Sequence, residues 1–145
     1  MSSFITYDTI EQYLNAQWPI ACAAASLEAT PLVYENMSFD LPDDPAHFVF
    51  AEIFGDTYDQ ESIGAEPRTG NLFREWGQLY LNVMTRNGIG TGLARKYATQ
   101  LVGLFQGLDV GTLTFREASI GAGEPGKNDG NYFRMTATVN WRRDQ

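Results

Sequence analysis

The segment GQLYLNVMTRNGIGTGLARKYATQLVGLF, residues 77–105, carries the clearest secondary-structure signal in the chain. It begins inside an alternating apolar pattern over 71–85 that predicts a strand, and Gly77 within that pattern indicates a β-bulge. The glycine-rich stretch 87–92 connects this strand to a helix that Thr91 is predicted to cap. Gly107 is predicted to end that helix, whose apolar face is Ala94, Tyr97, Ala98, Leu101, Val102 and Phe105.

Toward the N-terminus, a first amphipathic helix is predicted, with Thr6 as its N-cap and Ile10, Tyr13, Leu14 and Trp18 at helical spacing. Pro19 is expected to end or kink this helix, although the small residues of 21–26 could add a further turn.

Between the two helices, residues 32–34 form a short apolar piece, followed by a loop, and 47–54 fit a strand that is buried on most of both faces. Residues 55–70, rich in acids, are expected to be irregular or to form a mobile hairpin tip.

Toward the C-terminus, 112–116 is short and strand-like, 119–131 is a long glycine-rich loop, and 132–141 alternates as a half-buried strand. The predicted order is therefore α-β-β-β-α-β-β. We expect an α+β fold in which two helices pack on one face of a mainly antiparallel sheet. A length of 145 residues and a hydrophobic fraction of 43% indicate that 1–145 forms a single domain.

Several classes of protein are disfavoured by composition. Cys22 is the only cysteine and His47 the only histidine, so an internal disulfide, a thiolate cluster and a zinc site are not expected. The chain starts without a signal-peptide pattern and has no apolar run long enough for a membrane span. A cytosolic, soluble protein is the simplest interpretation.

The charges are unevenly distributed along the chain. Residues 1–67 contain twelve acids and no lysine or arginine, whereas 68–145 contain six acids and ten bases, within a net charge of -8. The acidic total disfavours tight DNA binding. Such a division suits a head-to-tail contact between identical subunits. Acidic and basic residues of the two parts could also lie intermixed on one surface, and the division would then have no functional meaning.

Candidate chemical sites have simpler structural interpretations. His47 is expected to be structural and Cys22 a core residue, and the run GIGTG at 88–92 lacks the lysine of a phosphate-binding loop, so a hinge is favoured. The acidic groups at 40–44 and 56–61 do not match a calcium loop, and either remain solvated or form an interface or channel lining. Phe39 and Leu41 form either a lid over the core or a docking patch.

Three segments together resemble the tail terminator-like proteins of long-tailed bacteriophages, prophages and gene transfer agents. They are PLVYENMSFDLPDDPAHFVFAEI at 31–53, the strand, turn and helix at 77–105, and YFRMTATVNWR at 132–142. The resemblance covers nearly the whole chain.

This resemblance implies a ring, usually hexameric, that ends polymerisation at the head-proximal end of the tail tube and joins the head connector or stopper protein. It implies no enzymatic activity and no cofactor, a place at the head-tail junction of the virion after assembly in the host cytoplasm, and DNA passing through the lumen without specific binding. No catalytic, cofactor-binding or metal residue is predicted. The expected interface residues are Phe39, Leu41, Asp43, Asp44, Asp56, Asp59, Glu61, Arg68, Arg74, Arg95 and Lys96.

Two alternatives remain open from the sequence. The chain could be a tail tube or head-completion protein, which would differ in copy number per particle. It could also be a small-ligand binding or enzyme domain, in which paired carboxylates would lie in a pocket near Trp76 or Tyr80.

Overall fold

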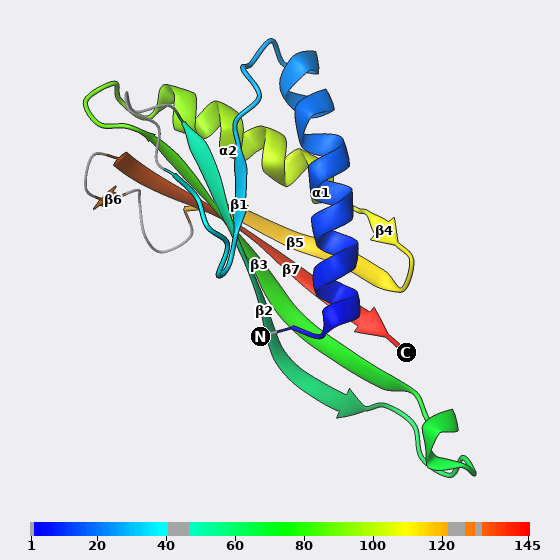
Figure 1. Ribbon diagram of the computed structural model, residues 1–145. Coiled ribbons are helices and arrows are strands. Elements are labelled where there is room, and N and C mark those ends of the chain that lie inside the picture. The colour runs from blue at the N-terminus through cyan, green and yellow to red at the C-terminus, as the bar shows by residue number, and fades with distance from the viewer. Residues whose placement is uncertain (1, 41–46, 122–126, 130–131) are drawn as a thin grey trace.

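A computed structural model describes residues 2–40, 47–121, 127–129 and 132–145, and Figure 1 shows two helices packed on one face of a mostly antiparallel sheet. Within these ranges the sheet order is β1-β2-β3-β7-β5-β4, with β6 paired to β7, and only the β1–β2 pair is parallel. The elements in chain order are α1 (Phe4–Ala24), β1 (Leu32–Tyr34), β2 (Phe48–Gln60), the 3-10 helix η1 (Arg68–Gly70), β3 (Phe73–Arg86), α2 (Gly92–Phe105), β4 (Asp109–Val110), β5 (Leu113–Ile120), β6 (Lys127–Asp129) and β7 (Tyr132–Asp144).

The predicted α+β class and element order are confirmed, with the short strands β4 and β6 as additions. The glycine-rich loop is shorter than expected, because β5 continues to Ile120 and β6 lies within the segment. The helix α2 begins after Thr91, as predicted, and Gly107 follows it with a positive φ of 61°. A positive φ favours glycine, which explains why the helix ends there.

The core lies between the two helices and the inner face of the sheet. The strands β3 and β7 pair along their length, so that Leu79 faces Val139 and Leu81 faces Ala137, and all four side chains are buried. The helix α1 covers them with Ile10, Leu14, Trp18 and Cys22, spaced four residues apart on one face and almost fully buried. The period-two pattern of the strands therefore separates an inner apolar face from an outer face.

The N-terminal helix differs from the prediction at both ends. Its N-cap is Ser3, whose hydroxyl accepts a hydrogen bond from the Thr6 amide, while Thr6 itself is buried inside the helix. Pro19 does not end the helix, which continues to Ala24. Pro19 and Asn15 are both exposed, so the carbonyl that loses its amide partner can be solvated.

The outer face of the sheet is covered by neither helix (Figure 1). At its centre Asn82 donates to the Phe50 carbonyl (3.1 Å) and to Glu52 (2.7 Å), and accepts from the Thr136 hydroxyl (2.7 Å). In the first part of β2 the inner-face residues Val49, Ala51 and Ile53 are fully buried, whereas Phe48 is the one buried residue on the outer face, so the expectation of burial on most of both faces is too strong. A small apolar cluster of Val33, Phe48, Met84 and Tyr132 lies separately from the main core.

The strands β2 and β3 form a long hairpin whose far end extends past the rest of the molecule (Figure 1). Residues 56–60, expected to be irregular or a hairpin tip, continue β2 and pair with β3 as far as Gln60 opposite Phe73. The predicted bulge is present, but on the partner strand: the register shifts between Gly55 and Thr57, opposite Gly77 and Trp76. This bulge leaves Asp56 as the extra residue.

Candidate functional site

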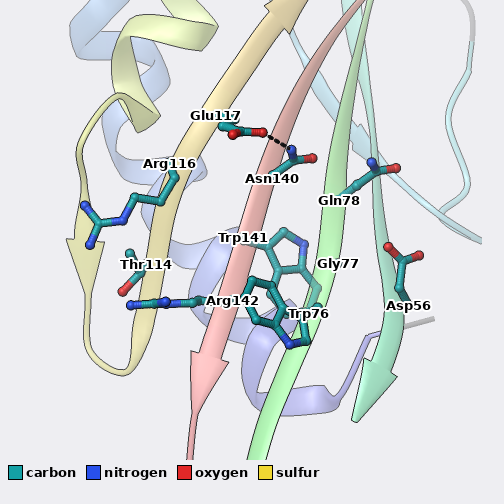
Figure 2. Close-up of a pocket in the computed structure, with 10 residues that line it drawn as sticks. All are labelled: Asp56, Trp76, Gly77, Gln78, Thr114, Arg116, Glu117, Asn140, Trp141 and Arg142. Carbon is teal, nitrogen blue, oxygen red and sulfur yellow. Dashed lines mark hydrogen bonds between the residues drawn. The ribbon is translucent and has the colours of Figure 1, made fainter. Parts of the chain in front are cut away.

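A groove of about 370 Å³ crosses the outer face of the sheet, and Figure 2 shows the side chains that line it. These side chains come from four strands, because β2, β3, β7 and β5 are neighbours in the sheet. The lining residues are Asp56 from β2, Trp76, Gly77 and Gln78 from β3, Asn140, Trp141 and Arg142 from β7, and Thr114, Arg116 and Glu117 from β5.

Two β-bulges border this groove on opposite sides. One is the bulge at Asp56 in β2. The other lies in β5, where the register shifts between Phe115 and Ala118, so that Arg116 and Glu117 both lie opposite Asn140. Bulges bend a strand and redirect its side chains. Here they place charged side chains at both edges of the groove.

Two buried polar atoms of the groove lining have no hydrogen-bond partner among the described residues, Asn140 Oδ1 and Arg142 Nε, whereas the equally unpaired Trp141 Nε1 belongs to a ring of the main core. The amide of Asn140 is already used, because it donates to Glu117 at 3.3 Å. An unpaired buried polar group costs about 1–3 kcal/mol. A molecule that enters the groove and supplies hydrogen-bonding groups would remove some of this cost.

The groove lining combines an exposed aromatic ring with charges of both signs, the acids Asp56 and Glu117 and the arginines Arg116 and Arg142. Arg116 is exposed, Arg142 is half-buried, and the Trp76 side chain is 38% exposed. The guanidinium carbon of Arg74 lies 5.6 Å from the centre of the Trp76 ring, within cation–π range. Tryptophan and arginine are enriched among the residues that dominate binding energy at protein interfaces. The lining is therefore typical of a protein-binding surface.

The far end of the β2–β3 hairpin carries the complementary chemistry. Asp59, Glu61 and Glu66 are exposed there. Two large side chains on the same hairpin also face solvent: Ile63 is 88% and Tyr58 is 55% exposed. The hairpin end is thus acidic and apolar at once.

The predicted interface residues fall into separate regions. Leu41, Asp43 and Asp44 lie outside the described residues. Asp56, Asp59, Glu61, Arg68 and Arg74 are brought together on the β2–β3 hairpin, whereas Arg95 and Lys96 are exposed on α2 and line another cavity with Ser26 and Gln100.

Several of these residues make contacts within the chain, among them Phe39 and Arg74. The Phe39 ring packs on Phe48 at 5.1 Å, next to the small apolar cluster. Arg74 donates two hydrogen bonds to Asp144, at 2.5 and 3.1 Å, and lies 4.0 Å from Glu61. The bond from Arg74 lowers the pKa of the Asp144 carboxyl.

The alternative of a pocket near Trp76 is the part of the sequence analysis that falls on this groove, and the other residues of its lining were not predicted. The bulge at Arg116 and Glu117 has no sequence signature, so the convergence of β5 on these residues could not be anticipated.

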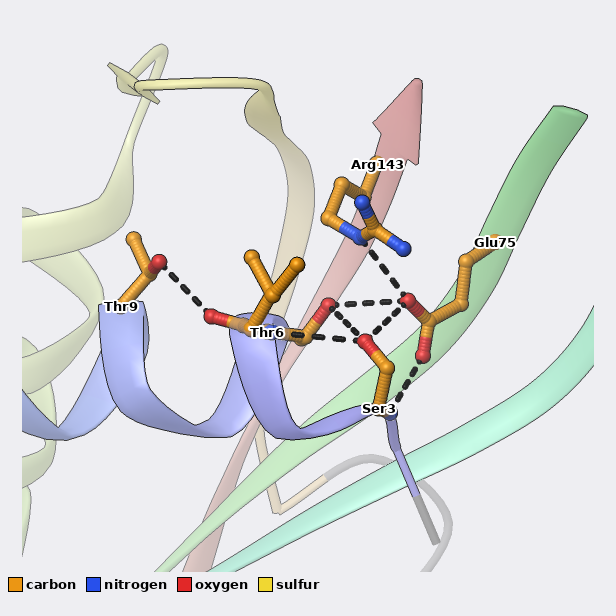
Figure 3. Close-up of polar contacts among 6 residues, drawn as sticks. Ser3, Thr6, Thr9, Glu75 and Arg143 are labelled. Carbon is orange, nitrogen blue, oxygen red and sulfur yellow. Dashed lines mark hydrogen bonds and ion pairs between the residues drawn. The ribbon is translucent and has the colours of Figure 1, made fainter. Parts of the chain in front are cut away.

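A buried polar cluster fixes the N-terminal segment against β3 and β7 (Figure 3). Glu75 accepts hydrogen bonds from the Ser3 amide (2.7 Å), the Ser3 hydroxyl (2.7 Å), the Thr6 hydroxyl (2.9 Å) and Arg143 Nε (3.1 Å). Burial opposes ionisation of Glu75, but these donors outweigh it and lower the pKa of the carboxyl. The cluster is fully paired, which indicates a structural role.

The described part of the chain contains no group of three histidine, cysteine, aspartate or glutamate side chains placed to hold a metal ion. None of its helices combines the length and apolarity needed to span a membrane. His47 contacts the Tyr97 ring and accepts a 3.3 Å hydrogen bond from the Arg86 amide, and Cys22 is fully buried, as their structural interpretations predict.

The fold places this chain in a class of α+β proteins with a known structural relative. One solved structure aligns over 99% of this chain and 96% of its own length, with a TM-score of 0.65 and 19% sequence identity, which establishes the fold alone. The family model for phage tail terminator proteins matches residues 7–141. The chain therefore belongs to the phage tail terminator protein family, and the resemblance noted from the sequence is confirmed. No match was found among curated proteins.

Family membership gives the chain a structural role in a phage tail. The family assignment implies contacts with other tail and head components.

Proposed function

We propose that copies of this chain form a closed ring, hexameric in the assembled particle, at the head-proximal end of the tail tube. The ring ends polymerisation of the tube protein and presents the surface that joins the head connector or stopper protein. It assembles in the host cytoplasm, needs no cofactor and catalyses no reaction. The match of the family model to residues 7–141 is the observation that carries this proposal.

The division of charge along the chain supports a ring. A ring closes when one face of each subunit binds a different face of the next. Residues 1–67 supply only acidic charge and 68–145 an excess of basic charge, so a contact between unlike faces can be electrostatically favourable. The interface is proposed to include the hairpin acids Asp56, Asp59 and Glu61, together with Arg68 and Arg74, and Arg95 and Lys96 on α2. Phe39, Leu41, Asp43 and Asp44 complete the proposed interface.

Acidic residues that are not used between subunits suit the lumen of the ring. A duplex that passes through the tail is repelled by like charge and does not adhere to the wall. This fits a net charge of -8 and supports a passage for DNA without specific binding.

Electron microscopy of the purified chain and of intact particles tests this proposal. The expected result is a single ring of this protein between the tube and the head. A tail tube protein would instead occupy many stacked rings, so the copy number per particle separates the two roles. A protein that is only monomeric when purified, with no ring at the upper end of the tube, would contradict the proposal.

A further inference from the structure

We propose that the outer-face groove of one subunit receives the far end of the β2–β3 hairpin of a second copy. This inference rests on the proposed ring and adds the two surfaces that meet within it. The groove side consists of Trp76, Arg116, Asn140 and Arg142, and the hairpin side of residues 58–66.

An occupant that supplies hydrogen bonds would satisfy buried polar atoms of the groove. Asn140 Oδ1 and Arg142 Nε are buried and have no partner among the described residues. Arg95 and Lys96 on α2 form a second basic surface that could receive an acidic segment. Their charges are exposed to solvent, and Arg95 already donates a hydrogen bond to the Thr91 hydroxyl at 3.1 Å. Unpaired buried groups beside an exposed tryptophan therefore distinguish the groove as the binding surface.

The hairpin end has the charge and shape to be that occupant. Arg116 makes no ion pair with a described residue and is exposed at the edge of the groove, so it is available to an acidic segment. Residues 58–66 carry Asp59, Glu61 and Glu66 without any lysine or arginine. The exposed Ile63 adds an apolar side chain that can pack against the Trp76 ring, and the polypeptide backbone supplies donors and acceptors to the unpaired groups.

The hairpin cannot reach the groove of its own chain. Asp56 and Trp76, which line the groove, are part of the same hairpin, and beyond them the two strands stay paired through Asp59 opposite Arg74 and Gln60 opposite Phe73. The far end points away from the sheet (Figure 1). The contact must therefore occur between copies, and it joins two different surfaces, as a closed ring requires.

Charge reversal tests the contact. Arg116→Glu is expected to raise the dissociation constant between subunits about tenfold or more, because it places like charges together. The matched control Arg86→Glu reverses an exposed arginine on β3 outside the groove lining and is expected to leave the constant unchanged. Adding Glu66→Arg or Asp59→Arg to Arg116→Glu is expected to restore association. Multi-angle light scattering after size-exclusion chromatography measures the assembly, and circular dichroism confirms that each variant is folded.

Cross-linking tests the partner directly. Cys22 is buried, so a cysteine introduced at the surface is the thiol that reacts with a cross-linker. A mixture of Ile63→Cys and Glu117→Cys proteins treated with a short bismaleimide is expected to yield a covalent heterodimer. Ile89→Cys, exposed but distant from the hairpin end, is expected to yield none when it replaces Ile63→Cys.

The outcomes separate this inference from the proposed function. A ring that survives Arg116→Glu and gives no heterodimer overturns the hairpin assignment while the ring stands, and the groove then binds another tail or head component. A wild-type protein that forms no ring contradicts the proposed function, and the heterodimer test at high protein concentration still decides the contact. A heterodimer together with loss of association in Arg116→Glu supports the inference.

Discussion

Gly77 is at the closest approach between β3, β2 and the aromatic core. A methyl group at this position would overlap the backbone oxygen of Phe54 and the ring of Trp141. Gly77→Ala is therefore expected to lower the free energy of unfolding by about 3 kcal/mol, the upper range for inserting a methyl group into a packed core. Urea denaturation followed by tryptophan fluorescence measures the change.

Gly103 provides the matched control for this substitution. It lies in α2, is exposed, and an added methyl group would have no heavy atom within 4 Å. Gly103→Ala is expected to raise the free energy of unfolding by about 0.5–1 kcal/mol, because alanine favours a helix interior. Equal changes in the free energy of unfolding for the two substitutions would show that the space around Gly77 can accept a methyl group.

Glu75 makes stability depend on pH at the acid side. Because the pKa of its carboxyl is lowered in the folded protein, the ionised form stabilises the fold above the unfolded pKa of about 4.3, and this contribution is lost as the pH falls through the lower folded pKa. Glu75→Gln is expected to cost about 3 kcal/mol at neutral pH, since it leaves the buried Arg143 without its counter-charge.

The acid profile distinguishes this charge effect from a loss of packing. Thermal unfolding measured from neutral pH down to about pH 3 should give a shallower decline for Glu75→Gln than for the wild type. Parallel profiles would contradict the assignment. The exposed Glu117→Gln, which lies outside the polar cluster, should reproduce the wild-type slope and serves as the control.

At the scale of elements, α1 remains one continuous helix although Pro19 lies inside it. The four buried residues at Ile10, Leu14, Trp18 and Cys22 extend across Pro19, so packing on the sheet holds the helix continuous. Pro19→Ala restores a backbone donor at an exposed position and is expected to raise the free energy of unfolding by about 2 kcal/mol. Thermal unfolding measures the gain, and a lower melting temperature would show that the bend at Pro19 is required for the packing of α1.

Elements with strong local patterns could be predicted from sequence, and those fixed by distant partners could not. The helix α2 and the strand β7 follow from regular apolar spacing, because one face of each is buried. The N-cap of α1 was misplaced at Thr6 because Ser3 is selected by Glu75, which is 72 residues away. The second half of β2 was missed because its side chains are exposed on both faces and carry no period-two signal.

The candidate site was predictable only in part, for the same reason. The acids at 56–61 are evident in the sequence by their charge, but that charge leaves open whether they remain solvated or form an interface or channel lining. The groove depends on Arg116 and Asn140 being brought together by a bulge between two strands, and no local pattern in either strand encodes that register shift.

At the scale of the whole molecule, the two proposed contact surfaces lie on different parts of one rigid sheet. The hairpin continues β2 and β3, and the groove crosses β3, β7 and β5, so the angle between them is set by the sheet itself. A fixed angle between two unlike binding surfaces determines whether successive subunits close into a ring or continue as a helix. The twist of this sheet is therefore expected to influence the number of subunits in the ring.

If opposite charges on successive subunits stabilise the ring, association must weaken as salt is added. Screening acts over about 8 Å at physiological ionic strength and over about 3 Å at about 1 M salt. The dissociation constant between subunits, measured by analytical ultracentrifugation across this range, is expected to rise with salt. Arg116→Glu, which has lost the attraction, should show a smaller dependence, whereas Arg86→Glu should keep the wild-type dependence. Association that is unchanged or strengthened by salt would instead assign the subunit contact to apolar side chains such as Ile63 and Trp76, because the hydrophobic effect is not screened.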